Sequence, residues 1–392
     1  MVSNDKIDEM KFYPVRISKE KEMTGTIEKR LAWPMFAILA FLALGAVVSA
    51  SPAMAGKQYQ QTNLVSDVPG MAQITDPNLV NSWGIVHGPT TPWWVADNGM
   101  GVSTLYNGTG VPSSLIVTIP PPPGGSSPST PTGIVFNGLP EFNVTPGNPA
   151  RFIFVTEDGT ISAWNPAVDP NNATLMMDNS PGAVYKGAAI ARNGNQDFLY
   201  VANFRGGSVD VFDTDFNPVM MAAGAFTDKK IPRGFAPFNV QNVNGELFVT
   251  FAKQDAQKHD NLDGPGLGFV DCFDPNGKLM MRLEHGKWMD APWGIALAPS
   301  DFGKFSDDLL VGNFGSGQIA AFEHENGNFK GLLSGDHGKP ISIDGLWGLG
   351  FGNGARAGPV NTLFFAAGIK KEQHGLFGTI TPISHKDKKD KD

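Results

Sequence analysis

Short apolar segments separated by turn residues run through the chain from residue 59 onwards. The stretch 292–327 shows the pattern clearly: one segment begins at Trp293, a second covers 309–312, and a third, 318–322, follows the glycine-rich turn 315–317. Segments of this length bounded by glycine, proline and asparagine are typical of β-hairpins, and long blocks with helical periodicity are missing. The pattern therefore predicts an all-β protein.

The same pattern recurs six times along the chain. A small or polar residue marks the first strand of each unit at intervals of 49 to 55 residues, namely Gly84, Gly133, Gly187, Asn239, Gly294 and Gly348. An even period near 50 is the signature of propeller blades, and glycine allows inner strands to crowd near a ring axis. After each of these residues come a second strand with a stronger β-strand pattern, a turn, a third strand, and a fourth strand with a weaker pattern. We therefore expect a six-bladed β-propeller with four-stranded blades that start near 81, 130, 185, 237, 292 and 346.

The last unit is short by one strand, because the chain enters a charged tail at 383–392 after its third strand. A spare β-like segment, 59–65 (YQQTNLV), precedes the first unit. Pairing 59–65 outside 375–380 would close the ring and remove an exposed strand edge. We therefore expect residues 56–382 to form one propeller, closed by the N-terminal strand of the mature chain, and the tail to be disordered.

An unbroken apolar run, 35–48 (MFAILAFLALGAVV), follows Lys29 and Arg30. It has the length of the apolar part of a signal peptide, and 53–55 (AMA) supplies a small-x-small cleavage pattern. A membrane anchor, the alternative, normally needs about 20 apolar residues. We therefore interpret 1–55 as a signal peptide with a long N-terminal region. The mature protein is expected to be secreted or periplasmic, without a membrane span, and monomeric.

Charge and composition narrow the function further. The net charge of −8, without a basic stripe, argues against a nucleic-acid partner. Cys272 is the only cysteine, and its alternating flanks indicate a buried, unreactive thiol. The sequence contains no H-E-x-x-H zinc motif, G-x-S-x-G elbow or P-loop, so its motifs identify no catalytic residue.

In a propeller, the connections that lead into the inner strands and those that join the second strand of a blade to the third lie on one face, around the channel. Polar residues in these connections are therefore expected on that face. We call it the channel face, and it is the default ligand site. Besides the candidates below, it is expected to receive Asn81, Ser82, Thr132, Asp158, Lys186, Arg205 and Asn239. Oxygen ligands converging on an axis suit Ca²⁺ or Mg²⁺, although turns also require Asp and Asn. The candidate metal ligands are Asn203, Asn313 and Asp344. The candidate ligand-binding residues are Asp97, Asn98, Glu157, Asn203, Lys253, His259, Asp290, Trp293, Asn313, Asp344 and Trp347.

Two features of that face leave alternatives open. The insertion 253–266 (KQDAQKHDNLDGPG) places His259 among aspartates and lysines. It is either a lid that supplies a general acid or base, or a solvated polar excursion. The tryptophans Trp83, Trp293 and Trp347 either form an aromatic channel mouth for flat ligands or pack the blades together.

Three segments carry a resemblance to known proteins: NSWGIVHGPTTPWWVADN (81–98), FAKQDAQKHDN (251–261) and DAPWGIALAPSDFGKFSDDLLVGNFG (290–315). The blade pattern resembles NHL-type propellers. More specifically, these segments are similar to a family of exported bacterial proteins of unknown function that are predicted to be six-bladed propellers. The likeness extends over residues 59–382. It implies the fold and export but brings no established reaction.

Two functions follow from these observations, and a scaffold in the cell envelope or matrix is a third alternative. The first is an exported propeller that binds a small-molecule or protein ligand at its channel face. The second is a metal-dependent hydrolase or lyase resembling the lactonase-type six-bladed propellers, which use a carboxylate at the first inner strand. Asn81-Ser82-Trp83 stands where a glutamate would be expected, which disfavours the enzyme, although Asn203, Asn313 and Asp344 would still fit its metal ligands.

Overall fold

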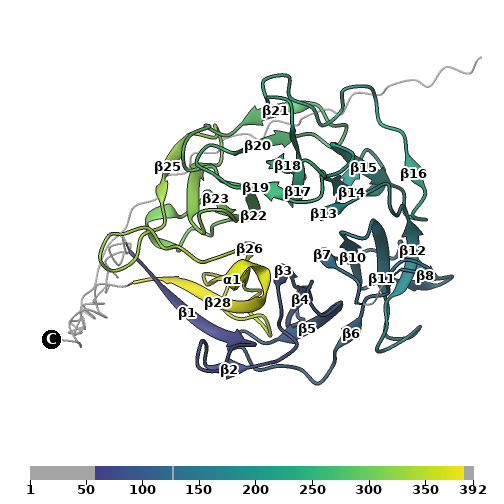
Figure 1. Cartoon of the computed structure of the whole chain (residues 1–392), viewed down its shortest axis with the longest axis horizontal. Coiled ribbons are helices and arrows are strands. Elements are labelled where there is room, and N and C mark those ends of the chain that lie inside the picture. The colour runs from purple at the N-terminus through teal and green to yellow at the C-terminus, as the bar shows by residue number, and fades with distance from the viewer. Residues whose placement is uncertain (1–57, 126–127, 384–392) are drawn as a thin grey trace, which may run out of the picture. The chain divides into compact units, whose positions relative to one another are not determined.

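Antiparallel hairpins dominate the computed structural model, which describes residues 58–125 and 128–383. They form six sheets of four or five strands, arranged as blades around a common axis (Figure 1). From the axis outwards, blade one consists of β3 (Ser82–Val86), β4 (Trp93–Asp97), β5 (Val102–Tyr106) and β6 (Val117–Thr118). Blade two consists of β7 (Pro131–Phe136), β10 (Phe152–Thr156), β11 (Thr160–Trp164) and β12 (Thr174–Asp178). Blade three consists of β13 (Tyr185–Asn193), β14 (Gln196–Asn203), β15 (Ser208–Phe212) and β16 (Pro218–Val219).

The other three blades follow the same plan, with small additions. From the axis outwards, blade four consists of β17 (Phe235–Val243), β18 (Glu246–Gln254), β20 (Gly268–Phe273) and β21 (Leu279–Arg282). Blade five consists of β22 (Pro292–Leu297), β23 (Asp308–Asn313), β24 (Ile319–Glu323) and β25 (Phe329–Leu332). Blade six consists of β26 (Leu346–Phe351), β27 (Leu363–Gly368), β28 (His374–Pro382) and β1 (Tyr59–Ser66). The additions are β2 (Ile74–Thr75) beside β1, β19 (Asn261–Leu262) beside β18, the hairpin β8 (Asn143–Thr145) and β9 (Asn148–Pro149), and the short helical turns η1 (Gly303–Phe305) and α1 (Ile369–Glu372).

The N-terminal strand closes the ring, as the sequence predicts. β1 pairs antiparallel with β28, from Tyr59 opposite Pro382 to Ser66 opposite Leu376. Tyr59 is buried, and its hydroxyl donates a hydrogen bond of 3.0 Å to the carbonyl of Phe302 in blade five. The last blade is thereby completed by the start of the described chain, and β28 has no free edge. The six-bladed, four-stranded fold is confirmed.

Glycines at the inner strands set the distance between blades. A Cβ on Gly84 would lie 2.6 Å from the carbonyl oxygen of Thr132 in the next blade, and one on Gly294 would lie 2.4 Å from that of Trp347. Real Cβ atoms do not approach backbone oxygen so closely. The residues at this level of the channel, Gly84, Gly133, Gly187, Asn239, Gly294 and Gly348, are called the glycine waist.

Between the blades, large apolar side chains interlock. Trp94 of blade one stacks on Phe152 of blade two with ring centroids 4.0 Å apart. Cys272 lies buried in β20, and burial raises the pKa of its thiol to about 12, so it stays protonated and unreactive. This agrees with its predicted role.

The described ranges contain no helix that is long and apolar enough to span a membrane. The predicted signal peptide, 1–55, and all but the first residue of the predicted tail, 383–392, lie outside the described residues.

We predict that Gly294→Ala destabilises the protein, because the new methyl group meets the Trp347 carbonyl of the neighbouring blade. The expected loss in the free energy of unfolding, measured by urea denaturation, is about 1–3 kcal/mol. Gly335→Ala is the matched control, since the atoms nearest to a Cβ on Gly335 would be 3.9 Å away, an ordinary van der Waals contact. Equal stabilities of the two variants would contradict the role of the glycine waist.

Candidate functional site

Three tryptophans plug the channel near the channel face. Trp83 and Trp347 are stacked with ring centroids 3.6 Å apart, and Trp293 meets both edge-on at 6.3 and 5.9 Å. At most 5% of any of the three is exposed. They therefore pack against one another and offer no open platform on which a flat ligand could stack. We call them the tryptophan plug.

A buried lysine lies directly over the plug. Lys186 of β13 is 1% exposed, with its Nζ 4.9 Å from the ring centroid of Trp83. Its ammonium forms an ion pair with Glu157, from the turn between β10 and β11, and lies 3.5 Å from Asp260. Burying a charge is costly unless it is paired and hydrogen-bonded, so Glu157 is the group that makes this burial tolerable.

Asparagines extend this ion pair across blades one and two. The amide of Asn98 donates to Glu157 Oε2 at 2.8 Å, and the amide of Asn81 donates to Asn98 Oδ1 at 3.1 Å. Asn81 Oδ1 in turn accepts the indole N–H of Trp83 at 3.0 Å. The network orients Glu157 towards Lys186 and ties both to the tryptophan plug.

The blade-four insertion reaches this network. His259 Nδ1 lies 2.9 Å from Asp260 Oδ1, and this contact raises the pKa of His259 and lowers that of Asp260 to about 2. Glu157, His259 and Asp260 offer ligand atoms within 4.8 Å of one another, as a metal site would. However, the ammonium of Lys186 contacts both carboxylates, so this cluster already contains a cation.

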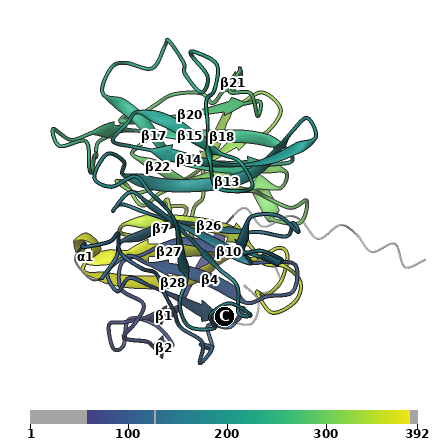
Figure 2. The same ribbon diagram turned by 90° about the vertical axis from the view of Figure 1, so that its right-hand side faces the viewer.

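A strained turn in blade six brings two more charged residues to the channel. Lys370, Lys371 and Glu372 of α1 all have left-handed backbone angles, with φ of 55°, 59° and 63°. A residue other than glycine in this left-handed conformation raises the free energy of the folded state by about 1 kcal/mol. Strain of this kind clusters at functional sites. Asp344 Oδ2 supports the turn by accepting the backbone N–H of Lys370 at 2.7 Å. Figure 2 shows α1 projecting at one side of the ring.

These groups surround a cavity of about 310 Å³, called the channel-face pocket. Its charged lining residues are Lys186, Asp260, Asp263, Asp344, Lys371 and Glu372. Burial, assisted by the charge of Glu157, raises the pKa of Glu372 to about 7. Burial and the neighbouring Asp290 raise the pKa of Asp263 to about 6. Among the described lining residues, four carboxyl groups thus face two lysines, and the pKa values of two of the four are raised towards neutrality.

The three predicted metal ligands, Asn203, Asn313 and Asp344, all accept hydrogen bonds from backbone N–H groups, and they do so at separate turns. Asn203 Oδ1 accepts the backbone N–H of Gly206 at 2.9 Å, which closes the turn after β14. Asn313 Oδ1 accepts the backbone N–H of Asp290 at 2.9 Å. Only Asp344 of the three lines the channel-face pocket, where it holds α1. The structure does not gather the three into one site.

The other predicted ligand residues divide between the pocket and its supports. Asp290 Oδ1 accepts the backbone N–H of Gly264 at 2.7 Å and so anchors the blade-four insertion. Asp97 is fully buried and accepts the hydroxyl of Thr104 at 2.7 Å, and burial raises its pKa. Lys253 donates to the carbonyl of Arg233 at 3.2 Å, outside the pocket lining.

Lys371 and Glu372 were missed by sequence reasoning. They follow the second strand of the last blade, at the position where blades one, two, three and five have a short hairpin turn and blade four has its insertion. The segment IKKEQ has no glycine to announce a left-handed turn, so the sequence carries no signal for it. Lys186 was expected on the channel face but was not chosen as a ligand residue.

We predict that Lys186→Met lowers the free energy of unfolding by about 3–5 kcal/mol, because it leaves the carboxylate of Glu157 buried and unpaired. The double variant Lys186→Met with Glu157→Gln should recover most of this loss in urea denaturation. A double variant as unstable as the sum of its single variants would contradict the coupling.

Comparisons with known proteins agree with the fold. No protein-family model matches the chain. An uncharacterized protein of Acanthamoeba polyphaga mimivirus is 30% identical over 338 residues, which cover 84% of this chain and 87% of that protein. A second uncharacterized protein of the same virus is 31% identical over 327 residues, covering 81% and 78%.

Solved structures resemble the chain at the level of fold. A protein of unknown function from Bacteroides thetaiotaomicron aligns with a TM-score of 0.50 and 9% identity over 84% of this chain and 75% of that one. A streptogramin B lyase aligns with a TM-score of 0.48 and 10% identity over 82% and 97%. The second likeness is too weak to support an inference.

Proposed function

This chain belongs to the family of the two uncharacterized mimivirus proteins, and we propose that it is a ligand-binding β-propeller whose channel-face pocket takes a small organic cation. The pocket lies where ligands of propellers are expected, around the channel mouth. Its volume of about 310 Å³ is at the lower end of the range for small-molecule sites, roughly 300–1,000 Å³.

The excess of carboxyl groups in the pocket carries this proposal. Asp260, Asp263, Asp344 and Glu372 outnumber the two lysines. Burial and neighbouring carboxylates make it unfavourable to ionise Asp263 and Glu372 together with the others. A positive charge brought in by a ligand would stabilise the ionised forms. An amine also donates the hydrogen bonds that carboxylates accept.

An organic cation suits the pocket better than Ca²⁺ or Mg²⁺. The cluster that most resembles a metal site, Glu157 with His259 and Asp260, already contacts the ammonium of Lys186. Either metal ion requires six or more ligands, mostly oxygens, so it would have to displace that ammonium from two carboxylates. Phe314 adds an aromatic surface to the pocket lining, which an organic cation can use and a hydrated metal ion cannot.

A hydrolase or lyase is the second candidate function, and Glu372 is the observation that favours it. A carboxyl group with a pKa near 7 at a pocket wall is suited to general acid–base catalysis. A metal-dependent form of this activity would require Ca²⁺ or Mg²⁺ at the Glu157, His259 and Asp260 cluster in place of Lys186. The binding proposal needs no such replacement and is therefore preferred.

The test of the proposed function is calorimetric titration of the protein with putrescine, agmatine and choline at pH 5 and pH 8. Affinity should rise on the order of tenfold between these pH values, because Glu372 and Asp263 ionise as the pH passes through 7 and 6. Glu372→Gln should weaken binding and reduce the pH dependence.

Asp336→Asn is the matched control, since it removes one carboxylate from an exposed loop outside the pocket lining. Parallel titrations of chelator-treated protein with Ca²⁺ and Mg²⁺ distinguish a metal site from an organic-cation site. Affinity that is independent of pH, or that rises as the pH falls, would overturn the proposal.

Export is a separate proposal and rests on the apolar run 35–48 and the cleavage pattern 53–55. When the full chain is expressed in a bacterium, the N-terminal residue of the exported protein is expected to be Gly56. Ala55→Arg should block this processing. An uncleaved N-terminus on protein recovered from the membrane fraction would support the anchor instead. The bacterial origin implied by the sequence resemblance also stays a prediction, because the two mimivirus relatives are viral proteins.

A further inference from the structure

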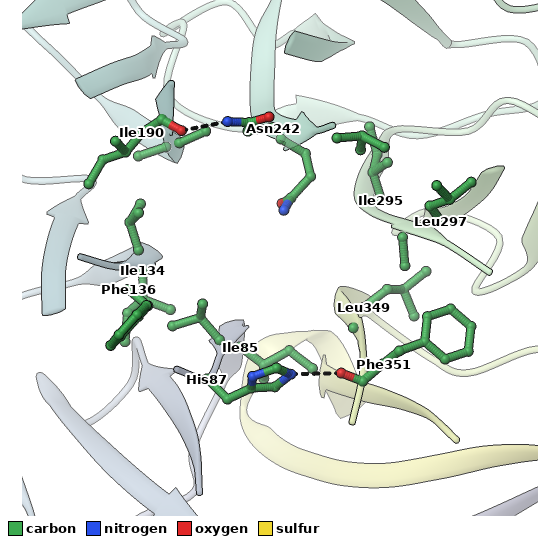
Figure 3. Close-up of a pocket in the computed structure, with 18 of the residues that line it drawn as sticks. Ile85, His87, Ile134, Phe136, Ile190, Asn242, Ile295, Leu297, Leu349 and Phe351 are labelled. Atoms are coloured by element: carbon green, nitrogen blue, oxygen red, sulfur yellow. Dashed lines mark hydrogen bonds between the residues drawn. The ribbon is translucent and has the colours of Figure 1, made fainter. Parts of the chain in front are cut away.

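The other end of the channel has an entirely different lining. Each inner strand enters the ring at the channel face and leaves at the opposite end, where its later residues surround a cavity of about 500 Å³ (Figure 3). Aliphatic side chains from all six blades line this cavity, which we call the apolar funnel: Ile85, Ile134, Ile190, Val243, Ile295, Leu297 and Leu349.

The funnel is separated from the channel-face pocket. Between them the glycine waist leaves a cavity of only about 20 Å³, which is enough for about one water molecule. Trp293 borders this narrow space, and the rest of the tryptophan plug lies beyond it. A molecule bound in the funnel therefore cannot reach Lys186 or Glu372, and the two ends are independent sites.

Almost all polar groups of the funnel are already paired. Among the residues that the structure describes, no Asp, Glu, Lys or Arg lines it. His87 Nε2 lies 2.7 Å from the carbonyl oxygen of Phe351, and the Asn242 amide donates to the carbonyl of Ile190 at 2.8 Å, as Figure 3 shows. These contacts turn the polar atoms towards the backbone and leave a mainly aliphatic surface.

Gln241 and Asn244 are the exceptions. Asn244 is exposed in the turn that follows β17, whereas Gln241 lies deeper. It is half-buried and lines both the funnel and the narrow space at the waist. Its amide has no hydrogen-bond partner within residues 58–125 and 128–383, although an amide offers two donors and an acceptor. One unpaired polar group at the inner end of an aliphatic cavity is the arrangement that orients an amphipathic small molecule.

We propose that the apolar funnel binds a small uncharged aliphatic molecule, with its hydrocarbon chain along the aliphatic lining and its single polar group on Gln241. Ile85, Ile190, Leu297 and Phe351 are each only half-buried, although all four face this one cavity. Covering them removes apolar surface from water, which supplies the binding free energy. Asp, Glu, Lys and Arg are absent from the described lining, which disfavours fatty acids and other ionised ligands.

The test uses the full chain and the uncharged fluorophore N-phenylnaphthylamine, with decanol as the displacing aliphatic alcohol. We expect saturable fluorescence enhancement with one site per chain and complete displacement by decanol. Ile190→Glu should weaken fluorophore binding at least tenfold, because it places a carboxylate in the uncharged funnel. Gln241→Leu should weaken decanol several-fold relative to the fluorophore.

Met220→Glu is the matched control for Ile190→Glu, since Met220 is 95% exposed and lies outside the funnel lining. Leu297→Glu serves as a second variant if circular dichroism shows that Ile190→Glu has not folded. Non-saturable binding to the unaltered protein would overturn the proposal. Equal fluorophore affinities of the glutamate variants and Met220→Glu would overturn it as well.

Discussion

Close contact between neighbouring inner strands constrains every other part of this fold. At the glycine waist, the Cα of one blade lies against the backbone of the next, as Gly84 does against Thr132 and Gly348 against Trp83. A side chain at these places would push the blades apart and widen the channel. Because the blades meet so closely at the waist, no large side chain fits there. The large side chains of the inner strands therefore lie at the two ends of the channel, where they pack against one another.

The two ends of the channel differ because each inner strand carries different residues before and after the waist. Before it come Trp83, Lys186 and Trp347, which form the tryptophan plug and the buried charge over it. After it come aliphatic residues such as Ile85 and Leu349, which form the apolar funnel. One ring of strands therefore carries a charged pocket at one end and an uncharged one at the other.

Residue type alone did not separate ligands from turn supports on the channel face. Asn203 and Asn313 have the oxygen atoms that a metal ion prefers, but each oxygen accepts a backbone N–H in its own blade. Asp344 combines both roles, because it lines the pocket and holds the strained turn of α1. The same chemistry that satisfies Ca²⁺ or Mg²⁺ also satisfies a turn, so the choice depends on which partner lies nearer.

The all-β class, the six blades and the closure of the ring by 59–65 could all be predicted from the sequence, because they follow from local alternation and a period of about 50 residues. The same blade pattern predicts that Asn98, Glu157 and His259 lie on one face. The folded chain was needed to show that Glu157 pairs with Lys186 and that Glu372 joins them from the last blade. The reason is physical: burial, charge pairing and the shape of a cavity depend on residues from different blades, such as Glu157, Lys186 and Glu372, whose approach no local pattern records.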